Sequence, residues 1–287
     1  MFNSHKRHIF TPDKLGNQLR FWITARDITI DGKPSLIKDG SNNVSQMYDL
    51  SQFNNHVIQG TGALQPLWED GQMGSNNLPL INFDGTQYLH CDGMIADDVF
   101  YNNTVADAYG SIFIVYEHSA DTQNRLFGLG RSDGSTVRQF YVGCDNATGT
   151  AGGIVKNRIG LRNRGSSNAF TISSNETDLT DQQQLVAECN KPGPILERVF
   201  YINDDFDGNA PNDDPVYVFP TGGSWFNASF GTNAPTDIGI GAWVRGSDAT
   251  FVASSFPIKI SEIIVTHQTT NRSREDITTY LRKSYGL

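Results

Sequence analysis

The chain has 287 residues, of which 31 are acidic and 22 basic, giving a formal net charge of −9. A strongly acidic protein repels the phosphates of nucleic acid, so we expect no nucleic-acid partner. Charged residues form 18% of the chain and glycine occurs 28 times, a composition that favours strands and turns over charge-rich helices. A chain of this length can bury enough apolar surface to fold without a metal or a disulfide, so we expect no required cofactor.

The first segment, Met1–Phe10, is basic and no apolar stretch follows it, so it does not resemble a secretion signal. No apolar run approaches the roughly 18 residues of a membrane span, and we expect no membrane insertion. Cys91, Cys144 and Cys189 are widely spaced and form no metal-binding pair, which predicts three buried thiols. We therefore expect a protein made in the cytoplasm without a signal peptide.

Short runs of β-branched and aromatic residues recur along the chain between turn residues. Leu80–Phe83 ends at the turn dipeptide Asp84-Gly85, after which Tyr88 resumes an extended run. Ser111–Tyr116 is continuously apolar, which predicts a central strand covered on both faces. Further strands are predicted at Arg138–Val142, Asn157–Arg164, Gln184–Glu188, Arg198–Ile202, Val216–Phe219, Asp237–Val244 and Pro257–Thr266. These are enough strands for two sheets.

One helix is predicted, over Asn271–Leu287 at the end of the sequence. Ser273 is the candidate N-cap because Asp276 follows three residues later, and apolar residues then recur at helical spacing. Gly286 is the expected helix stop.

Four segments in chain order together resemble the laminin-G-like, concanavalin-type domains of bacteria and phages. They are Leu19–Asp27 (LRFWITARD), Val44–His56 (VSQMYDLSQFNNH), Pro79–Leu89 (PLINFDGTQYL) and Ile260–Leu287. The resemblance implies an all-β fold, a two-sheet concanavalin-like jelly-roll sandwich with one short C-terminal helix. It covers residues 19–287 as a single domain, and residues 1–18 are then an N-terminal arm.

Catalysis is not predicted. Glucanases of this architecture carry a Glu-x-Asp-x-Glu run, because retaining hydrolysis needs two carboxylates about 5–5.5 Å apart. The sequence has no such run, and Glu69-Asp70, Glu176-Thr177-Asp178 and Glu275-Asp276 have the wrong spacing. It also lacks the His-Glu-x-x-His motif of zinc-dependent hydrolases.

An acidic loop offers a candidate calcium site. Its twelve residues (NDDFDGNAPNDD) match the ligand spacing of an EF-hand, with glycine in the sixth place. The candidate ligands are Asn203, Asp205, Asp207 and Asp214. Because both flanks resemble strands, a solvated acidic hairpin is the alternative.

Two further groups are candidates for binding glycans or partners. Trp68 and Trp225 have aromatic faces on which sugar rings stack, although core packing is the alternative for both. The second group is four basic residues that alternate with aliphatic ones, so a strand would turn all four to one face. There they would dock an anionic polysaccharide or a neighbouring subunit, and the alternative is that they are simply solvated. They are Lys156, Arg158, Arg162 and Arg164.

These observations lead to three hypotheses. The first is a non-enzymatic phage virion structural protein, a head or tail decoration or fibre-type module, located in the virion, whose lectin-like jelly roll binds host-surface glycans. Its partners would be other virion proteins, host polysaccharide and, in a homo-oligomer, copies of itself. The alternative is a free, calcium-assisted carbohydrate-binding lectin module, and the second alternative is a polysaccharide hydrolase.

Overall fold

The structure is a computed structural model. It describes residues 10–92, 110–118, 124–130, 139–144, 159–164, 170–173, 183–191, 197–202, 205–209, 237–245, 250–253, 257–267 and 270–287. These residues form two large antiparallel sheets and one helix, α2 (Asn271–Tyr285), which confirms the predicted all-β class and the C-terminal helix. No helix within the described ranges is long and apolar enough to cross a membrane.

The eight-stranded sheet, which we call sheet A, lies between the helix and the second sheet. Its strands run in the order β17 (Asp205–Asn209), β16 (Glu197–Ile202), β15 (Gln183–Lys191), β10 (Gly110–His118), β21 (Ile258–His267), β8 (Leu78–Phe83) and β7 (Leu67–Met73), and β1 (Leu19–Thr24) pairs with β21 beside β8.

The nine-stranded sheet, which we call sheet B, covers the other face of sheet A. Its order is β14 (Phe170–Ser173), β13 (Ile159–Arg164), β12 (Gln139–Cys144), β11 (Asn124–Gly130), β18 (Asp237–Ile240), β9 (Leu89–Asp92), β6 (Val57–Ile58), β5 (Val44–Met47) and β4 (Leu36–Lys38). Two small hairpins, β2 (Thr29–Ile30) with β3 (Lys33–Pro34) and β19 (Ala242–Arg245) with β20 (Thr250–Ala253), and the 3-10 turns η1 (Pro12–Gln18) and η2 (Gly62–Leu64) complete the fold.

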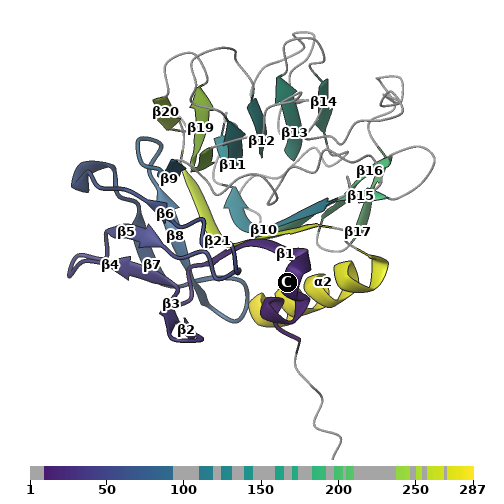
Figure 1. Ribbon diagram of the computed structural model, residues 1–287, viewed down its shortest axis with the longest axis horizontal. Coiled ribbons are helices and arrows are strands. Elements are labelled where there is room, and N and C mark those ends of the chain that lie inside the picture. The colour runs from purple at the N-terminus through teal and green to yellow at the C-terminus, as the bar shows by residue number, and fades with distance from the viewer. Residues whose placement is uncertain are drawn as a thin grey trace, which may run out of the picture.

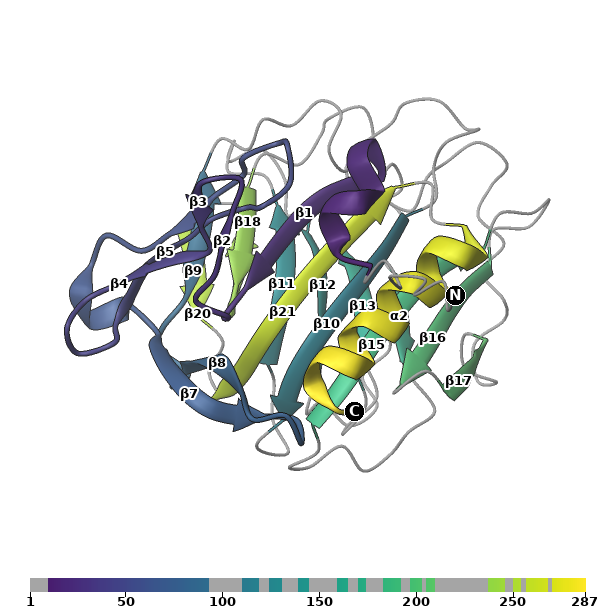
Figure 2. The same cartoon turned by 90° about the horizontal axis from the view of Figure 1, so that it is seen from below.

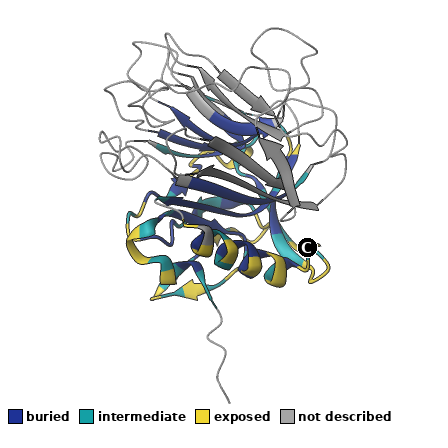
Figure 3. Ribbon diagram, turned by 90° about the vertical axis from the view of Figure 1, so that its right-hand side faces the viewer, coloured by how far each residue is buried: buried dark blue, intermediate teal, exposed yellow. Residues whose placement is uncertain are grey.

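The molecule therefore has three layers, with α2 on one side, sheet A in the middle and sheet B on the other side (Figure 1). Figure 2 shows α2 lying across β10 and β15, and Figure 3 shows that the buried residues are concentrated in the sheets. Strand β10 is buried on both faces, as predicted for Ser111–Tyr116. Ile112 and Ile114 belong to the core between the sheets, whereas Phe113 and Val115 belong to the core under α2.

Most other predicted strands are present with small changes at their ends. The strand predicted over Asp237–Val244 is broken at Gly241, where the chain leaves sheet B. Val216–Phe219 lies outside the described residues. Cys91, expected to be a buried thiol, is only half-buried against the core between the sheets.

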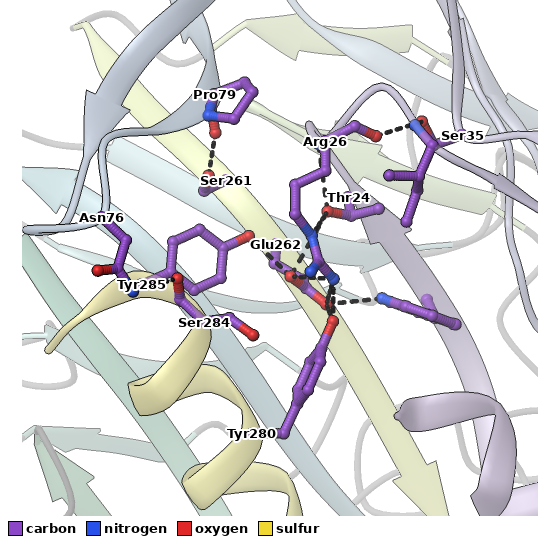
Figure 4. Close-up of polar contacts among 12 residues, drawn as sticks. Thr24, Arg26, Ser35, Asn76, Pro79, Ser261, Glu262, Tyr280, Ser284 and Tyr285 are labelled. Carbon is purple, nitrogen blue, oxygen red and sulfur yellow. Dashed lines mark hydrogen bonds and ion pairs between the residues drawn. The ribbon is translucent and has the colours of Figure 1, made fainter. Parts of the chain in front are cut away.

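Glu262 is a buried carboxylate between sheet A and α2 (Figure 4). Its Oε1 accepts hydrogen bonds from the indole Nε1 of Trp22 (2.8 Å) and the hydroxyl of Tyr280 (3.0 Å). Its Oε2 accepts one from the hydroxyl of Tyr285 (2.7 Å), and an Arg26 guanidinium nitrogen lies 3.4 Å away. A buried carboxylate is tolerated only when it is paired and hydrogen-bonded, and this one ties β1 and α2 to β21.

A β-bulge turns Glu262 toward the helix. Val115 pairs with Glu262, but its neighbour Tyr116 pairs with Ile260, so β21 contains one extra residue, Ser261, at this point. Ile260 therefore faces the core between the sheets, whereas Glu262 faces α2. Burial, reinforced by the negative charge of Glu262, raises the pKa of Tyr285 well above its usual value, so its hydroxyl stays a donor.

The N-cap of the helix lies three residues before the predicted one. Thr270, not Ser273, is the N-cap, and the hydroxyl of Thr270 accepts from the backbone N–H of Ser273 (3.1 Å). Ser273 completes the capping box by accepting from the backbone N–H of Thr270 (2.8 Å), the part that Glu or Gln usually takes. Gly286 ends the helix in a left-handed conformation, as predicted, and Asn76 donates to the carbonyls of Lys283 and Ser284 (2.9 Å each).

Part of the predicted N-terminal arm is packed against the domain. Residues 12–18 form η1, which lies beside β1 and β21. The ring of Phe10 meets the ring of Tyr280 edge-on at 6.3 Å, and Leu15 also contacts the core under α2. Residues 1–9 lie outside the described part of the chain.

The loop after β5 is organised by a second buried carboxylate, Asp49. It accepts hydrogen bonds from the backbone N–H groups of Trp22 (3.0 Å), Ser51 (2.9 Å) and Asn55 (2.9 Å). The backbone N–H of Asp49 donates to Nδ1 of His56 (3.0 Å), which requires that nitrogen to be unprotonated. Burial lowers the pKa of His56 below its usual 6.5, against the opposing attraction of Asp49.

Replacing Glu262 should destabilise the fold strongly. In Glu262→Ala, the buried indole and the two tyrosine hydroxyls lose their acceptor and Arg26 loses its counter-charge, so we expect the free energy of unfolding to fall by ~3–5 kcal/mol. Urea unfolding measures this change. The control is Glu275→Ala on the exposed side of α2, where we expect a change within ~0.5 kcal/mol. Equal effects of the two substitutions would show that Glu262 does not hold the helix.

The stability should also depend on the protonation of His56. The pKa of His56 is lower in the folded chain than in the unfolded chain. The stabilisation that the neutral imidazole contributes is therefore complete above about pH 6.5 and is lost as the pH falls through the folded-state pKa. We expect the free energy of unfolding to decline over this window. The decline should be smaller in His56→Asn, whose side-chain oxygen accepts the same hydrogen bond without titrating. Identical pH profiles of the two proteins would rule out His56 as the cause.

Candidate functional site

A single row of residues crosses the outer face of sheet B, which is the face turned away from sheet A. Each member lies directly opposite the next on the neighbouring strand, and such residues point to the same side of a sheet. The flanking residues Leu89 and Ile238 belong to the core, so the row faces outward. We call it the outer row; from β4 to β12 it consists of Ile37, Gln46, Ile58, His90, Gly239, Gly128 and Tyr141.

An aromatic cluster stands on the outer row at β9. The ring of His90 lies 4.5 Å from that of Phe251 in β20 and 5.7 Å from that of Tyr88, and the rings of Tyr88 and Phe251 are nearly parallel at 6.0 Å. All three side chains are half-buried. We call Tyr88, His90 and Phe251 the aromatic cluster.

The backbone around Tyr88 is held by the preceding loop. The backbone N–H of Tyr88 donates to the carbonyl of Leu64 (3.3 Å), and its own carbonyl accepts from the side chain of Gln59 (3.2 Å). The same Gln59 side chain accepts from the backbone N–H of Thr61 (3.0 Å), which fixes its orientation. Tyr88 is thus positioned from both sides before β9 begins.

Two glycines let the β19–β20 hairpin reach the aromatic cluster. A Cβ on Gly239 would lie 2.9 Å from the carbonyl oxygen of Ala242, so only glycine fits beneath the turn. Gly241 has a φ of 69°, and its Cβ would lie 2.6 Å from Cδ1 of Phe83. From this turn β19 runs beside β11, and β20 brings Phe251 over β9; Figure 1 shows the hairpin at the upper edge, far from α2.

The two ends of the outer row differ in exposure. Ile37 and Ile58 are 43% and 45% exposed, and they are the exposed large hydrophobic residues of the described part of the chain. At β11 and β12, by contrast, the Arg125 guanidinium lies 4.0 Å from the ring centroid of Tyr141, and both side chains are buried. The accessible part of the row is therefore its β4–β9 end.

Trp68, predicted to bind glycans, lies in β7 rather than in an exposed loop. Its Nε1 donates to the carbonyl of Ala25 (2.8 Å), and the ring is half-buried against the core between the sheets. The ammonium group of Lys38 lies 3.2 Å from the ring centroid and also pairs with Asp27 (3.5 Å). One face of this indole is thus already occupied by a cation. Trp225 lies outside the described residues.

The predicted basic stripe is described only in part. Arg162 and Arg164 lie in β13, where Arg162 pairs with Tyr141 of β12. Lys156 and Arg158 lie outside the described residues.

The predicted calcium loop contains a strand. Asp205 and Asp207 lie in β17, which pairs with β16 through contacts such as Ile202 with Asp205, as the alternative of an acidic hairpin requires. Asn203 and Asp214 lie outside the described residues, and within those described no group of three or more His, Cys, Asp or Glu could hold a metal. Calcium binding stays a prediction.

Comparison with known proteins supports the sandwich fold and does not identify a family. No protein-family model and no curated protein sequence matches the chain. Among solved structures, the binding domain of paraclostridial mosquitocidal protein 1 is similar with a TM-score of 0.50 and 9% identity. The match covers 91% of this chain and 51% of that one, so this chain spans about half its length. At this identity the similarity shows a shared fold and nothing more.

Weaker similarities connect the chain to domains solved with sugars. The CBM40 domain of the IT-sialidase from Ruminococcus gnavus, bound to α2,3-sialyllactose, has a TM-score of 0.39 and 14% identity, covering 61% of this chain and 84% of that one. Domain 4 of AbnA, a GH43 extracellular arabinanase from Geobacillus stearothermophilus in complex with arabinotriose, has a TM-score of 0.41 and 16% identity, covering 77% and 82%.

Substituting Gly241 should displace the hairpin that carries Phe251. Gly241→Ala places a Cβ in a left-handed conformation and against the Phe83 ring, so we expect a loss of ~2–4 kcal/mol in the free energy of unfolding. Gly40→Ala is the matched control, because a Cβ there would meet nothing within 4 Å. Denaturant unfolding of both variants measures the difference, and equal stability would mean that the turn at Gly241 is not constrained.

Proposed function

We propose that this chain is a glycan-binding module and that its binding surface is the aromatic cluster together with Ile58. One observation carries the proposal: an exposed isoleucine lies opposite His90 on the outer row, directly beside three half-buried aromatic rings. A sugar ring has apolar C–H faces, and the faces and edges of aromatic side chains bind such groups. The β-sandwich fold supports the proposal by presenting this face outside the core.

Polar groups lie in the turn before Tyr88 and in the loop that holds its backbone. The turn before Tyr88 is fixed by Asp84, whose Oδ1 accepts from the backbone N–H (2.8 Å) and the hydroxyl (2.7 Å) of Thr86. Asp84 and Thr86 are exposed, and so is Thr61 in the loop that holds Tyr88. Carboxylate and hydroxyl groups around an apolar platform are the set that selects among sugar hydroxyls.

We propose binding without hydrolysis. Retaining hydrolysis needs two carboxylates about 5–5.5 Å apart across the sugar, and inverting hydrolysis needs a pair at about 6.5–9.5 Å. The aromatic cluster contains no carboxylate, and Asp84 alone precedes it in the adjoining turn. The buried carboxylates Asp49 and Glu262 are engaged with the fold and do not belong to this surface.

Two more specific hypotheses stay proposals. A phage virion component would use the same surface on host glycans and would contact other virion proteins through a different one. A calcium-assisted lectin would add Asn203, Asp205, Asp207 and Asp214 to the binding site. Both are separable from the glycan-binding proposal by experiment.

A glycan array with the wild-type chain, run with and without a calcium chelator, tests the proposal. We expect reproducible binding, and binding weakened by roughly 2- to 10-fold in Tyr88→Ala and in Phe251→Ala, from the ~0.5–1.5 kcal/mol of one aromatic contact. Tyr88→Phe keeps the ring and should bind as the wild type does. Phe53→Ala removes a half-buried ring that lies under Arg20 and outside the cluster, and it should also bind normally.

The array separates the hypotheses. Binding abolished by the chelator would favour the calcium-assisted lectin. Wild-type binding that is unchanged in both cluster variants would place the glycan site elsewhere on the chain. The absence of any glycan binding by the wild-type chain would refute the proposed function.

A further inference from the structure

We infer that the binding surface extends along the outer row from His90 to Ile37, and that it binds about three to four sugar units of a neutral, extended polysaccharide running across the strands. This extension rests on the proposed glycan-binding function. It adds the ligand's length, direction and charge, none of which follows from the aromatic cluster alone.

The register of sheet B sets the length and direction. Ile37 in β4 lies opposite Gln46 in β5, Gln46 lies opposite Ile58 in β6, and Ile58 lies opposite His90 in β9. Neighbouring strands are about 4.8 Å apart, so these three steps span roughly 14 Å. A pyranose ring is about as wide as one strand spacing, so a chain crossing the strands meets one side chain of the row per sugar unit.

The exposure of the row singles out these positions. Ile37 is 43% and Ile58 45% exposed, and they are the large hydrophobic residues that the described chain leaves exposed. Scattered single exposed residues need no explanation, but these two occupy the same row with one half-buried polar residue, Gln46, between them. An amide between two apolar contacts both donates and accepts hydrogen bonds, which suits the hydroxyls of a sugar that stacks on either side.

Charge selects a neutral ligand. Ile37, Gln46 and Ile58 carry no charge, while the whole chain has a formal net charge of −9. An acidic polysaccharide would find no cation in this part of the row and would be repelled by the protein as a whole. A second copy of this chain is a poorer occupant, because two isoleucines and an amide offer far less than the ~800 Å² per partner that a stable dimer buries.

Calorimetric titration of the full chain with neutral linear oligosaccharides tests the inference. The probes are cello-, laminari- and malto-oligosaccharides of increasing length, from the monosaccharide to the hexasaccharide. We expect affinity in one series to rise up to about the trisaccharide or tetrasaccharide and then to level off. Ile37→Ser should weaken binding of the hexasaccharide by roughly 2- to 10-fold and leave the disaccharide unaffected, whereas Tyr88→Ala should weaken both. Ile37→Val, which keeps an apolar surface, is the matched control, and unfolding curves confirm that each variant is folded.

The outcomes separate this inference from the proposed function. One outcome would overturn the extended row and leave the proposed glycan site unaffected. In that outcome, Tyr88→Ala weakens binding, but affinity does not depend on oligosaccharide length and does not change in Ile37→Ser. Preference for anionic glycans would overturn the predicted charge of the ligand. A dimer in sedimentation that Ile37→Ser dissociates would assign the row to a second copy. No binding by the wild type would overturn both proposals.

Discussion

Glu262 holds together the three elements that define this fold. Its carboxylate accepts hydrogen bonds from Trp22 in β1 and from Tyr280 and Tyr285 in α2, while Arg26 supplies the positive charge (Figure 4). Removing this carboxylate from water is costly, and the cost is offset only when every one of these donors is in place. The helix, the first strand and the last strand therefore have one arrangement that satisfies the carboxylate, which makes the contact a constraint on geometry as well as an attraction.

That constraint decides which surface of the sandwich is available. Because α2 is fixed over sheet A, strand β10 is covered on both faces: Phe113 and Val115 are buried on the helix side, and Ile112 and Ile114 are buried on the other. Sheet B has its core face against sheet A and its other face outward. Its β4–β9 end carries the exposed isoleucines and the aromatic cluster, whereas Arg125 and Tyr141 are buried at β11 and β12. The helix and the proposed binding surface therefore lie on opposite sides of the molecule.

The aromatic cluster joins residues that are distant in the chain. Tyr88 and His90 flank a buried leucine, and this alternation alone places them on one face of a strand, so they were within reach of sequence reasoning. Phe251 was not, because it arrives through a turn that depends on Gly239 and Gly241. Trp68 was predicted to bind sugars, yet its indole N–H donates to the carbonyl of Ala25. An indole N–H that finds a protein acceptor is a structural group before it is a binding group.

Local patterns in the sequence were enough to predict the all-β class, the central strand over Ser111–Tyr116 and the helix ending at Gly286, because periodicity and capping are local properties. They did not determine that Glu262 faces the helix. Strict alternation from Ile258 and Ile260 would put Glu262 in the core between the sheets, and only the bulge at Ser261 turns it to the other side. The outer row was likewise decided by tertiary structure, because it depends on the pairing register of strands drawn from the whole chain. A register is set by packing between segments that no local pattern compares, which is why the surface proposed for function emerged only from the folded chain.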